Sequence, residues 1–247
     1  SEGSLCLSES MLRERVTATR KKVKPNEIDA ACESLIEAEQ VKRYCNTAGE
    51  CLFYLPENNE LETATTEAIL KLLKAEKTSP ISYHEINWLL DFYELDKQMT
   101  LSREQRDAIT SAFTAPMSVI TGGPGTGKTA VTDAICSLIQ YHDSDIKVRL
   151  CAPTGKAAVH LTETTGYTAT TIHSLLSSRS VKCDYMIVDE MSMVSIELFV
   201  ALIQKLPPSV HLIMVGDPDQ LPCIGSGNIL RDLIASGRVP TVKLQSV

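Results

Sequence analysis

The run of residues 122–129 has the composition of a phosphate-binding loop. It consists of Gly122, Gly123, Pro124, Gly125, Thr126, Gly127, Lys128 and Thr129, directly after an apolar, strand-like run. Glycines let backbone amides turn toward phosphate oxygens, and a following helix adds the positive end of its dipole. We expect Lys128 to reach the β- and γ-phosphates of a nucleotide and the Thr129 hydroxyl to hold Mg²⁺. The alternative is a glycine-rich turn without a ligand, and the full match in a strand–loop–helix context disfavours it.

A second candidate segment ends the apolar run 185–188 with Asp189 and Glu190. Asp189 is placed to bind Mg²⁺, directly or through water, and Glu190 to polarise an attacking water. Strands often end in solvated acids, but a phosphate loop on the same sheet favours the catalytic interpretation. The adjacent glutamate also favours hydrolysis over a switch that stores its nucleotide.

A third segment, Val215-Gly216-Asp217-Pro218-Asp219-Gln220-Leu221-Pro222, follows the next strand-like run. Taken alone, its Gly-Asp-Pro-Asp core is an ordinary turn. After the first two segments in this order, it indicates a γ-phosphate sensor, with Gln220 contacting the phosphate and Asp217 tethering the loop.

The elements that must position these segments form a βα alternation from residue 99 onward. The expected strands are short, continuous and rich in Val and Ile, as strands buried on both faces should be. Helical segments separate them, which predicts a parallel sheet in an α/β fold of the P-loop NTPase class, with helices on both faces. The strands are expected at 118–121, 148–152, 185–188, 211–215 and 241–244.

Residues 1–75 have a different texture. A helix starting near Pro25, two apolar runs at 41–44 and 51–55 around a turn, and a further amphipathic helix predict a small, mostly helical, winged-helix-like domain. Residues 76–98 form a connector that contains Trp88, the only tryptophan. Its aromatic stripe could stack on bases, but packing between domains is the favoured interpretation.

Composition sets outer limits on function. The chain has 247 residues, 43% of them hydrophobic, and a net charge of −7, which argues against a protein that coats nucleic acid. No apolar run approaches the roughly 20 residues that cross a bilayer. The eight cysteines show no zinc spacing, and the expected location is a reducing cytoplasm. Cys45 and Cys51 could face each other across a hairpin, but packing as thiols is favoured.

The order of the three segments resembles the RecD-like branch of the superfamily 1 DNA helicases, the family of the exodeoxyribonuclease V alpha subunit. The sequence Gly-Asp-x-x-Gln-Leu-Pro at 216–222 is typical of their motif III. Residues 101–109 resemble their Gln motif, in which Gln105 would contact adenine. Residues 152–158 resemble motif Ia, and 171–176 resemble the Thr-Ile-His segment of this branch.

The resemblance implies that motif Ia and the Thr-Ile-His segment face single-stranded DNA. The candidate DNA contacts are therefore Thr154, Lys156, Thr171 and His173. For Lys156 a phosphate contact is favoured over a solvated lysine at a helix end. For His173, two interpretations are equally favoured: a buried core histidine with its hydrogen bonds made, or a DNA contact.

The resemblance also implies a domain plan: an accessory domain at 1–75, the connector at 76–98, and a first RecA-like motor domain at 99–247 that binds ATP and Mg²⁺. No second set of motor motifs follows, and that second domain supplies an arginine finger in the family. We therefore expect this chain alone to bind nucleotide but to hydrolyse it slowly, since a missing finger costs about 10³–10⁵ in turnover. The short join at 177–183 also predicts that an insertion belongs there.

Single-stranded DNA and other subunits of a nuclease–helicase complex are the partners that the resemblance implies. Two rival functions remain open. One is a P-loop regulatory ATPase or switch that binds a protein partner without DNA-coupled hydrolysis. The other is a DNA-binding adaptor with a vestigial loop, against which the intact Lys128, Thr129, Asp189 and Glu190 argue.

Overall fold

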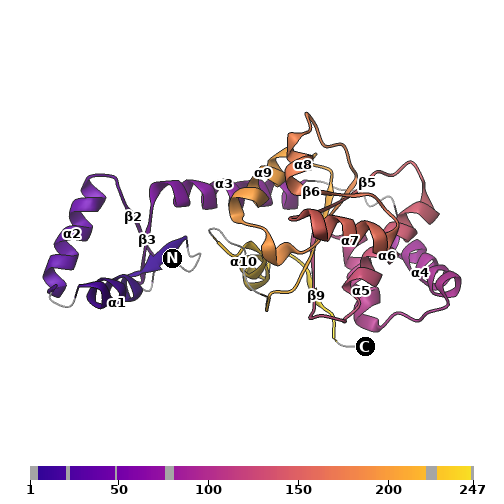
Figure 1. Ribbon diagram of the computed structural model, residues 1–247, viewed down its shortest axis with the longest axis horizontal. Coiled ribbons are helices and arrows are strands. Elements are labelled where there is room, and N and C mark those ends of the chain that lie inside the picture. The colour runs from indigo at the N-terminus through magenta and orange to yellow at the C-terminus, as the bar shows by residue number, and fades with distance from the viewer. Residues whose placement is uncertain (1–4, 21–22, 48, 76–80, 221–226, 246–247) are drawn as a thin grey trace.

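The computed structural model describes residues 5–20, 23–47, 49–75, 81–220 and 227–245 (Figure 1). Its centre is a six-stranded parallel sheet in the order β6-β5-β7-β8-β4-β9, as the α/β prediction requires. The strands are β4 (Met117–Thr121), β5 (Val148–Ala152), β6 (Ala169–Thr171), β7 (Tyr185–Val188), β8 (His211–Gly216) and β9 (Thr241–Lys243). All five strands expected from the sequence are confirmed, and β6 is an additional edge strand.

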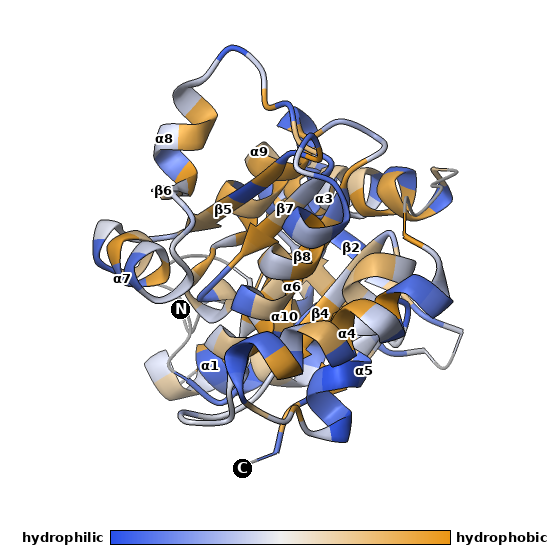
Figure 2. Cartoon of the chain, turned by 90° about the vertical axis from the view of Figure 1, so that its right-hand side faces the viewer, coloured by the Kyte–Doolittle hydropathy of each residue, from blue (hydrophilic) through white to orange (hydrophobic). Residues whose placement is uncertain are grey.

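Alternation along the central strands divides the core into two layers. In β7, Ile187 faces one layer while Met186 and Val188 face the other, and in β4 Ile120 and Val119 do the same. Because both faces are covered, all residues of β4, β7 and β8 are buried, which explains their continuous apolar sequences. Figure 2 shows these apolar strands between helices that turn their polar sides outward.

Each face of the sheet is covered by its own group of helices. The first layer is built with α4 (Tyr83–Lys97), α5 (Arg103–Thr114), α6 (Lys128–His142) and α7 (Gly155–Thr165). The second is built with the end of α3 (Pro56–Lys74), α8 (Ile172–Ser177), η1 (Met191–Met193), α9 (Ile196–Lys205) and α10 (Ile229–Ser236). Residues 178–184 join α8 directly to β7.

The N-terminal region has a separate three-stranded antiparallel sheet, in the order β1-β3-β2. Its strands are β1 (Cys6–Ser8), β2 (Lys42–Cys45) and β3 (Cys51–Tyr54), and α1 (Glu9–Thr19) and α2 (Pro25–Glu37) accompany them. Figure 1 places this region at one end of the molecule, connected to the large sheet by the long helix α3. Ala68, Ile69 and Leu73 of α3 pack against the second layer of the core.

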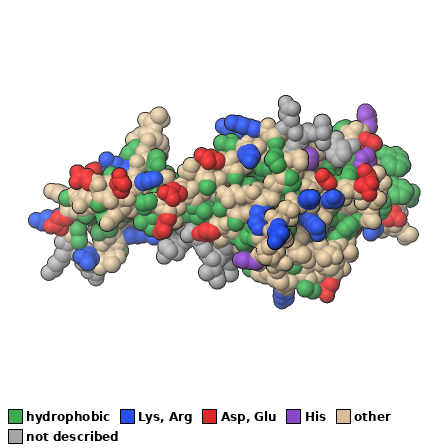
Figure 3. All heavy atoms as spheres, turned by 90° about the horizontal axis from the view of Figure 1, so that it is seen from above, with side chains coloured by type: hydrophobic (Ala, Val, Ile, Leu, Met, Phe, Trp, Pro, Cys, Tyr) green, Lys and Arg blue, Asp and Glu red, His purple; other side chains and the backbone are tan. Residues whose placement is uncertain are grey.

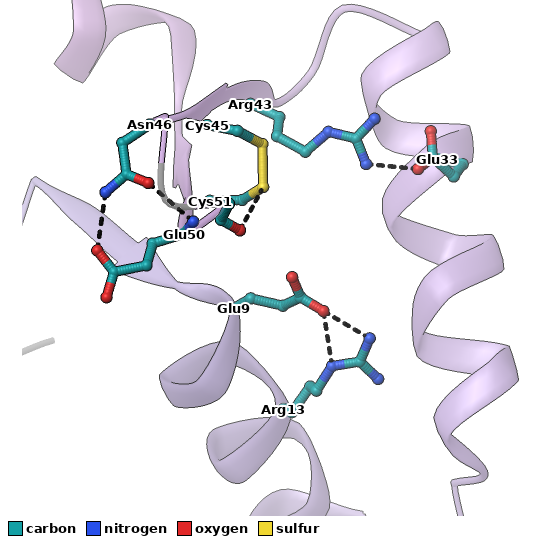
Figure 4. The surroundings of a disulfide bond; sticks show 9 residues. Glu9, Arg13, Glu33, Arg43, Cys45, Asn46, Glu50 and Cys51 are labelled. Atoms are coloured by element: carbon teal, nitrogen blue, oxygen red, sulfur yellow. Dashed lines mark hydrogen bonds and ion pairs between the residues drawn. A yellow bond between two sulfur atoms is a disulfide. The ribbon is translucent and has the colours of Figure 1, made fainter.

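The prediction that Cys45 and Cys51 pack as thiols is wrong. Pairing of β2 with β3 sets the two residues directly opposite each other, with Cα atoms 4.0 Å apart, and their sulfurs form a disulfide (Figure 4). The strand register decides this, because it brings the two side chains within bonding distance. A register cannot be obtained from the spacing of two cysteines alone.

The prediction for the aromatic stripe of the connector is correct for only part of it. Leu89, Leu90 and Tyr93 of α4 are buried in the first layer, whereas Trp88 and Phe92 are exposed. The helical period is the reason, since it places residues 88 and 92 on the side of α4 that faces away from the sheet. Among the described helices, none is both long and apolar enough to span a membrane.

Candidate nucleotide-binding site

The loop between β4 and α6 occupies the carboxyl edge of the large sheet. Gly127 caps α6 with a φ of 84°, a left-handed conformation that favours glycine. A Cβ atom at Gly122 would lie 2.4 Å from Thr126 Oγ1, so the loop closes on itself too tightly for a side chain there. Thr126 Oγ1 also donates a hydrogen bond of 2.9 Å to the Gly123 carbonyl. The loop is therefore a tight turn that ends at a helix N-terminus.

Hydrogen-bond donors converge on this loop. Lys128 Nζ donates to the carbonyl oxygens of Gly122 at 2.6 Å and Gly123 at 2.8 Å, so its ammonium group lies over the loop. Within the described residues, the amides of Gly123, Gly125 and Gly127 donate no backbone hydrogen bond. Amides that donate no backbone hydrogen bond, an ammonium group and a helix N-terminus together suit the phosphate chain of a nucleotide.

Asp189 and Glu190 follow β7, two strands away from β4 in the sheet. The Asp189 amide donates to the Cys151 carbonyl at 2.9 Å, which fixes the end of β7 beside β5. Glu190 has a φ of 51°, and its amide donates to Asp189 Oδ1 at 2.8 Å. That bond holds a left-handed conformation that is uncommon for glutamate, of the kind that concentrates at functional sites.

The pKa shifts of Asp189 and Glu190 show which charged groups lie near them. Burial raises the pKa of Asp189, and the positive charge of Lys128 opposes that shift. Burial also raises the pKa of Glu190, and the negative charges of Asp189 and Asp217 add to it. The structure thus brings Lys128, Asp189 and Asp217 within electrostatic range of Glu190. Carboxylates and the Thr129 hydroxyl are oxygen ligands that suit Mg²⁺.

The turn after β8 contains Asp217 and Gln220. The Asp217 side chain is buried and its Oδ1 accepts from the Asp219 amide at 3.0 Å, while its carbonyl accepts from the Gln220 amide at 3.2 Å. Arg231 Nε of α10 donates to the Pro218 carbonyl at 2.8 Å and ties the turn to that helix. The rest of the motif, Leu221 and Pro222, lies outside the described residues.

Gln105 lies behind the phosphate loop. It completes a capping box at the start of α5. Its side-chain Oε1 accepts from the backbone amide of Ser102 at 2.8 Å, and its own backbone amide donates to Ser102 Oγ at 3.2 Å. The side chain is buried, and a Cβ atom at Gly127 would lie 2.3 Å from its Nε2. The structure therefore places Gln105 against the loop; contact with adenine stays a prediction.

Two of the four candidate DNA contacts are helix caps on adjacent strands. Thr154 Oγ1 caps α7 by accepting from the Ala157 amide at 3.2 Å, and Thr171 Oγ1 caps α8 by accepting from the Ser174 amide at 3.1 Å. Ala152 of β5 pairs with Thr171, which brings the two caps to the same edge of the sheet. Lys156 and His173 are exposed. His173 is therefore not a core histidine, which removes that alternative.

Sequence reasoning missed two residues near the site. Arg231 has no signal in the sequence, because its bond to the Pro218 carbonyl of the turn depends on how α10 packs. His160 of α7 lies within electrostatic range of both Asp189 and Glu190. Its place one helical turn after Lys156 was the available signal. Among the described residues, no group of three or more His, Cys, Asp or Glu side chains could hold a metal ion alone.

Comparison with known proteins adds an independent finding. The AAA domain family matches residues 105–226, which include the whole phosphate loop and the Asp189–Glu190 pair. The ATP-dependent RecD2 DNA helicase of Deinococcus radiodurans is 40% identical over 157 residues, covering 60% of this chain and 21% of that protein. This chain is similar to RecD-like helicases over 60–70% of its length.

Other RecD-like proteins agree. The RecBCD enzyme subunit RecD of Haemophilus influenzae is 34% identical over 206 residues, covering 70% of this chain and 32% of that subunit. Among solved structures, the UvsW helicase of bacteriophage T4 has a TM-score of 0.49 and 10% identity, covering 68% of this chain and 69% of that one. The chain thus spans about a fifth to a third of the length of its RecD-like relatives.

Proposed function

We propose that this RecD-like chain is the ATP-binding half of an ATP-dependent DNA helicase. It would bind ATP with Mg²⁺ and contact single-stranded DNA in the cytoplasm. One observation carries the proposal: the phosphate loop, the Asp189–Glu190 pair and the Asp217–Gln220 turn follow three strands of one parallel sheet at its carboxyl edge. Ligands of open α/β sheets bind at this edge.

The roles in nucleotide chemistry follow from the placement of each group. Lys128 and the loop amides would neutralise the phosphate chain, with Thr129 and Asp189 holding Mg²⁺. ATP supplies the phosphoryl group that is transferred to water. Glu190 would orient that water and accept its proton, and its raised pKa suits a base that works nearer neutral pH.

Coupling to movement is assigned to the turn after β8. Asp217 lies within electrostatic range of Glu190, and Gln220 lies three residues further along the same turn. A change of charge at the nucleotide would therefore change the electrostatic energy of the turn. The bond from Arg231 to the turn would pass a movement of the turn on to α10. Gln220 is the residue that would sense the γ-phosphate.

Contact with DNA is assigned to the edge formed by the starts of α7 and α8. The amides at these helix starts and the exposed Lys156 can bind backbone phosphates without reading sequence. Thr154, Thr171 and His173 complete the candidate surface. Since one relative is named as a RecBCD enzyme subunit, we also propose other subunits of a nuclease–helicase complex as partners.

The test measures two affinities for each variant: that of a fluorescent ATP analogue with Mg²⁺ and that of a fluorescein-labelled oligo-dT strand. Lys128→Ala should weaken nucleotide binding about 10- to 100-fold, because a charge-assisted hydrogen bond contributes about 1.5–3 kcal/mol. Its oligo-dT affinity without nucleotide should be unchanged. Lys156→Ala should weaken oligo-dT binding and leave the nucleotide affinity unchanged. It should also lower the salt dependence of DNA binding by about one released ion.

Lys71→Ala, an exposed lysine on α3, is the matched control and should change neither affinity. The proposal is wrong if the wild-type chain binds ATP but shows no affinity for oligo-dT with or without nucleotide. That result would favour a regulatory P-loop ATPase. If Lys156→Ala and Lys71→Ala weakened DNA binding equally, the proposed DNA-binding surface would be wrong. The proposed nucleotide site would be unaffected by that result.

A further inference from the structure

The outer side of α4 presents a cluster of exposed aromatic and aliphatic side chains. Trp88, Phe92 and Leu95 are 65%, 43% and 77% exposed, and Tyr141 of α6 is 37% exposed beside them. Together we call these four residues the aromatic face. Residues 88, 92 and 95 are spaced by four and three, so they form one stripe along the helix. Hydrophobic side chains gather at this end of the molecule in Figure 3, where Figure 1 places α4.

Ring contacts hold the aromatic face in a fixed arrangement. Trp88 stacks on Phe92 with centroids 5.8 Å apart, and Phe92 meets Tyr141 edge-on at 5.1 Å. Tyr141 Oη donates to Asp96 Oδ2 at 2.7 Å. A partner would therefore bind aromatic side chains that have already lost much of their freedom, which lowers the entropic cost of association.

The contacts of α4 with the buried core come from its other side. The opposite side of α4 buries Ile86, Leu89, Leu90 and Tyr93 in the core. On the same inner side, Tyr93 Oη donates to Asp133 Oδ2 at 2.8 Å and links α4 to α6. Contiguous exposed aromatic side chains on a well-anchored helix are typical of protein interfaces.

The charges around the aromatic face are mainly negative. Among the residues that the structure describes, the neighbouring cations are already paired, Lys97 with Asp133 and Arg106 with Asp91 and Glu94. Phosphates of a nucleic acid would be repelled by this rim, whereas Lys and Arg side chains would complement it. The acidic residues on α4 are Glu85, Asp91, Glu94 and Asp96, of which Asp91 and Glu94 pair with Arg106, and Asp143 and Asp145 follow α6.

We propose that the aromatic face docks an amphipathic helix of a partner protein, with aliphatic anchor residues flanked by Lys and Arg. Packing of one apolar helix stripe against another is a common mode of recognition. The face adjoins the C-terminal end of α6, roughly 20 Å from the phosphate loop at its start. The occupant would thus leave the nucleotide site open, and the inference does not rest on the helicase proposal.

Trp88 provides the measurement, because it is the only tryptophan of the chain. The probes are a synthetic amphipathic peptide of Leu and Lys, and a matched peptide in which Glu replaces every Lys. Only the Lys peptide should shift Trp88 emission to the blue and protect it from acrylamide quenching. Leu95→Ser should weaken this binding about tenfold, the usual cost of losing one interface anchor. Leu35→Ser, an exposed leucine on α2, should leave it unchanged.

Four results would overturn the inference. Trp88 could respond to neither peptide, or equally to both, which would remove the basic helix as the occupant. It could respond to oligo-dT, which would make the surface a platform for bases. Emission could shift on concentrating the chain alone, which would identify a second copy. Finally, Leu35→Ser could weaken binding as much as Leu95→Ser, which would mean that the peptide binds the acidic chain without a specific site.

Discussion

The N-terminal sheet and the large parallel sheet are stabilised in different ways. Every residue of β7 and β8 is buried, whereas β2 has no buried residue and α1 has none either. In α2 only Ile28 is buried. The large sheet therefore depends on hydrophobic burial on both faces, which a small exposed sheet cannot provide.

Cross-links add to a small core of Ile28, Phe53 and Tyr54 in the N-terminal region. The disulfide Cys45–Cys51 closes the β2–β3 hairpin, and Arg43 Nη1 lies 2.5 Å from Glu33 Oε1 on α2. Figure 4 shows both links, with the Glu9–Arg13 pair on α1 beside them. Exposed ion pairs contribute little. We infer that this region unfolds more easily than the large sheet that carries the nucleotide site.

The largest difference is expected from matched truncations in the two sheets. Ile187 lies at the centre of β7, fully buried between Leu150 of β5 and Ile213 of β8. Ile187→Ala should lower the free energy of unfolding by about 2–5 kcal/mol, because it leaves a cavity in a covered sheet. Leu52→Ala in the partly exposed β3 should cost less than about 1 kcal/mol.

Urea denaturation followed by circular dichroism and by Trp88 fluorescence gives both values. Trp88 lies on α4 and reports the unfolding of the large sheet and its helices. Equal losses in the two variants would show that the small sheet has a core comparable to the large one.

A smaller effect is expected from the disulfide. Replacing both Cys45 and Cys51 by Ser should destabilise the N-terminal region by about 2 kcal/mol, the loop-entropy estimate for a short closed loop. The Trp88 transition should not move. Limited trypsin digestion, with fragments identified by mass spectrometry, would show faster cleavage in residues 1–55 than in the large sheet.

Dithiothreitol provides the control for this experiment. It should make the wild-type chain as sensitive to trypsin as the double variant, and it should leave the variant unchanged. A shift of the Trp88 transition in the double variant would show instead that the two regions unfold together.

The same contrast explains what the sequence could predict. The strands β4, β7 and β8 were predictable because a strand that is buried on both faces has a continuous run of apolar residues. By contrast, β6 was missed because the half-buried Ala169–Thr171 lies at a sheet edge and has no such pattern. The disulfide depended on strand register, and no local pattern of Cys45 and Cys51 reveals it. For α4, the helical period did contain the answer, since 86, 89, 90 and 93 lie opposite 88, 92 and 95.

For the site, sequence predicted which groups converge but not how each is held. Lys128, Asp189 and Asp217 follow their strands in the expected order. Burial of Gln105 against Gly127 and the bond from Arg231 to Pro218 depend on how α5 and α10 pack. Contacts between elements distant in the chain have no local signature, so motif spacing could not reveal them.

The smallest predicted effect concerns buried charge in the large sheet. Burial raises the pKa of Asp189 above its ordinary value, so the folded state binds the proton more tightly than the unfolded state. Stability from this group is therefore fully present below its ordinary pKa and is lost as the pH rises through the raised value. Asp189→Asn should raise the free energy of unfolding at pH 7 by roughly 1 kcal/mol, as replacements of strained functional groups often do.

Urea midpoints measured between pH 4 and pH 8, without nucleotide or Mg²⁺, test this prediction. The gain from Asp189→Asn should shrink toward low pH, where the wild-type carboxyl group is protonated in both states. Glu33→Gln is the matched control, because Glu33 is exposed and paired with Arg43 in the N-terminal region. It should give no measurable gain at any pH, since exposed ion pairs contribute little. A gain independent of pH would mean that Asp189→Asn stabilises through packing, and the acids of the site would then carry no electrostatic cost.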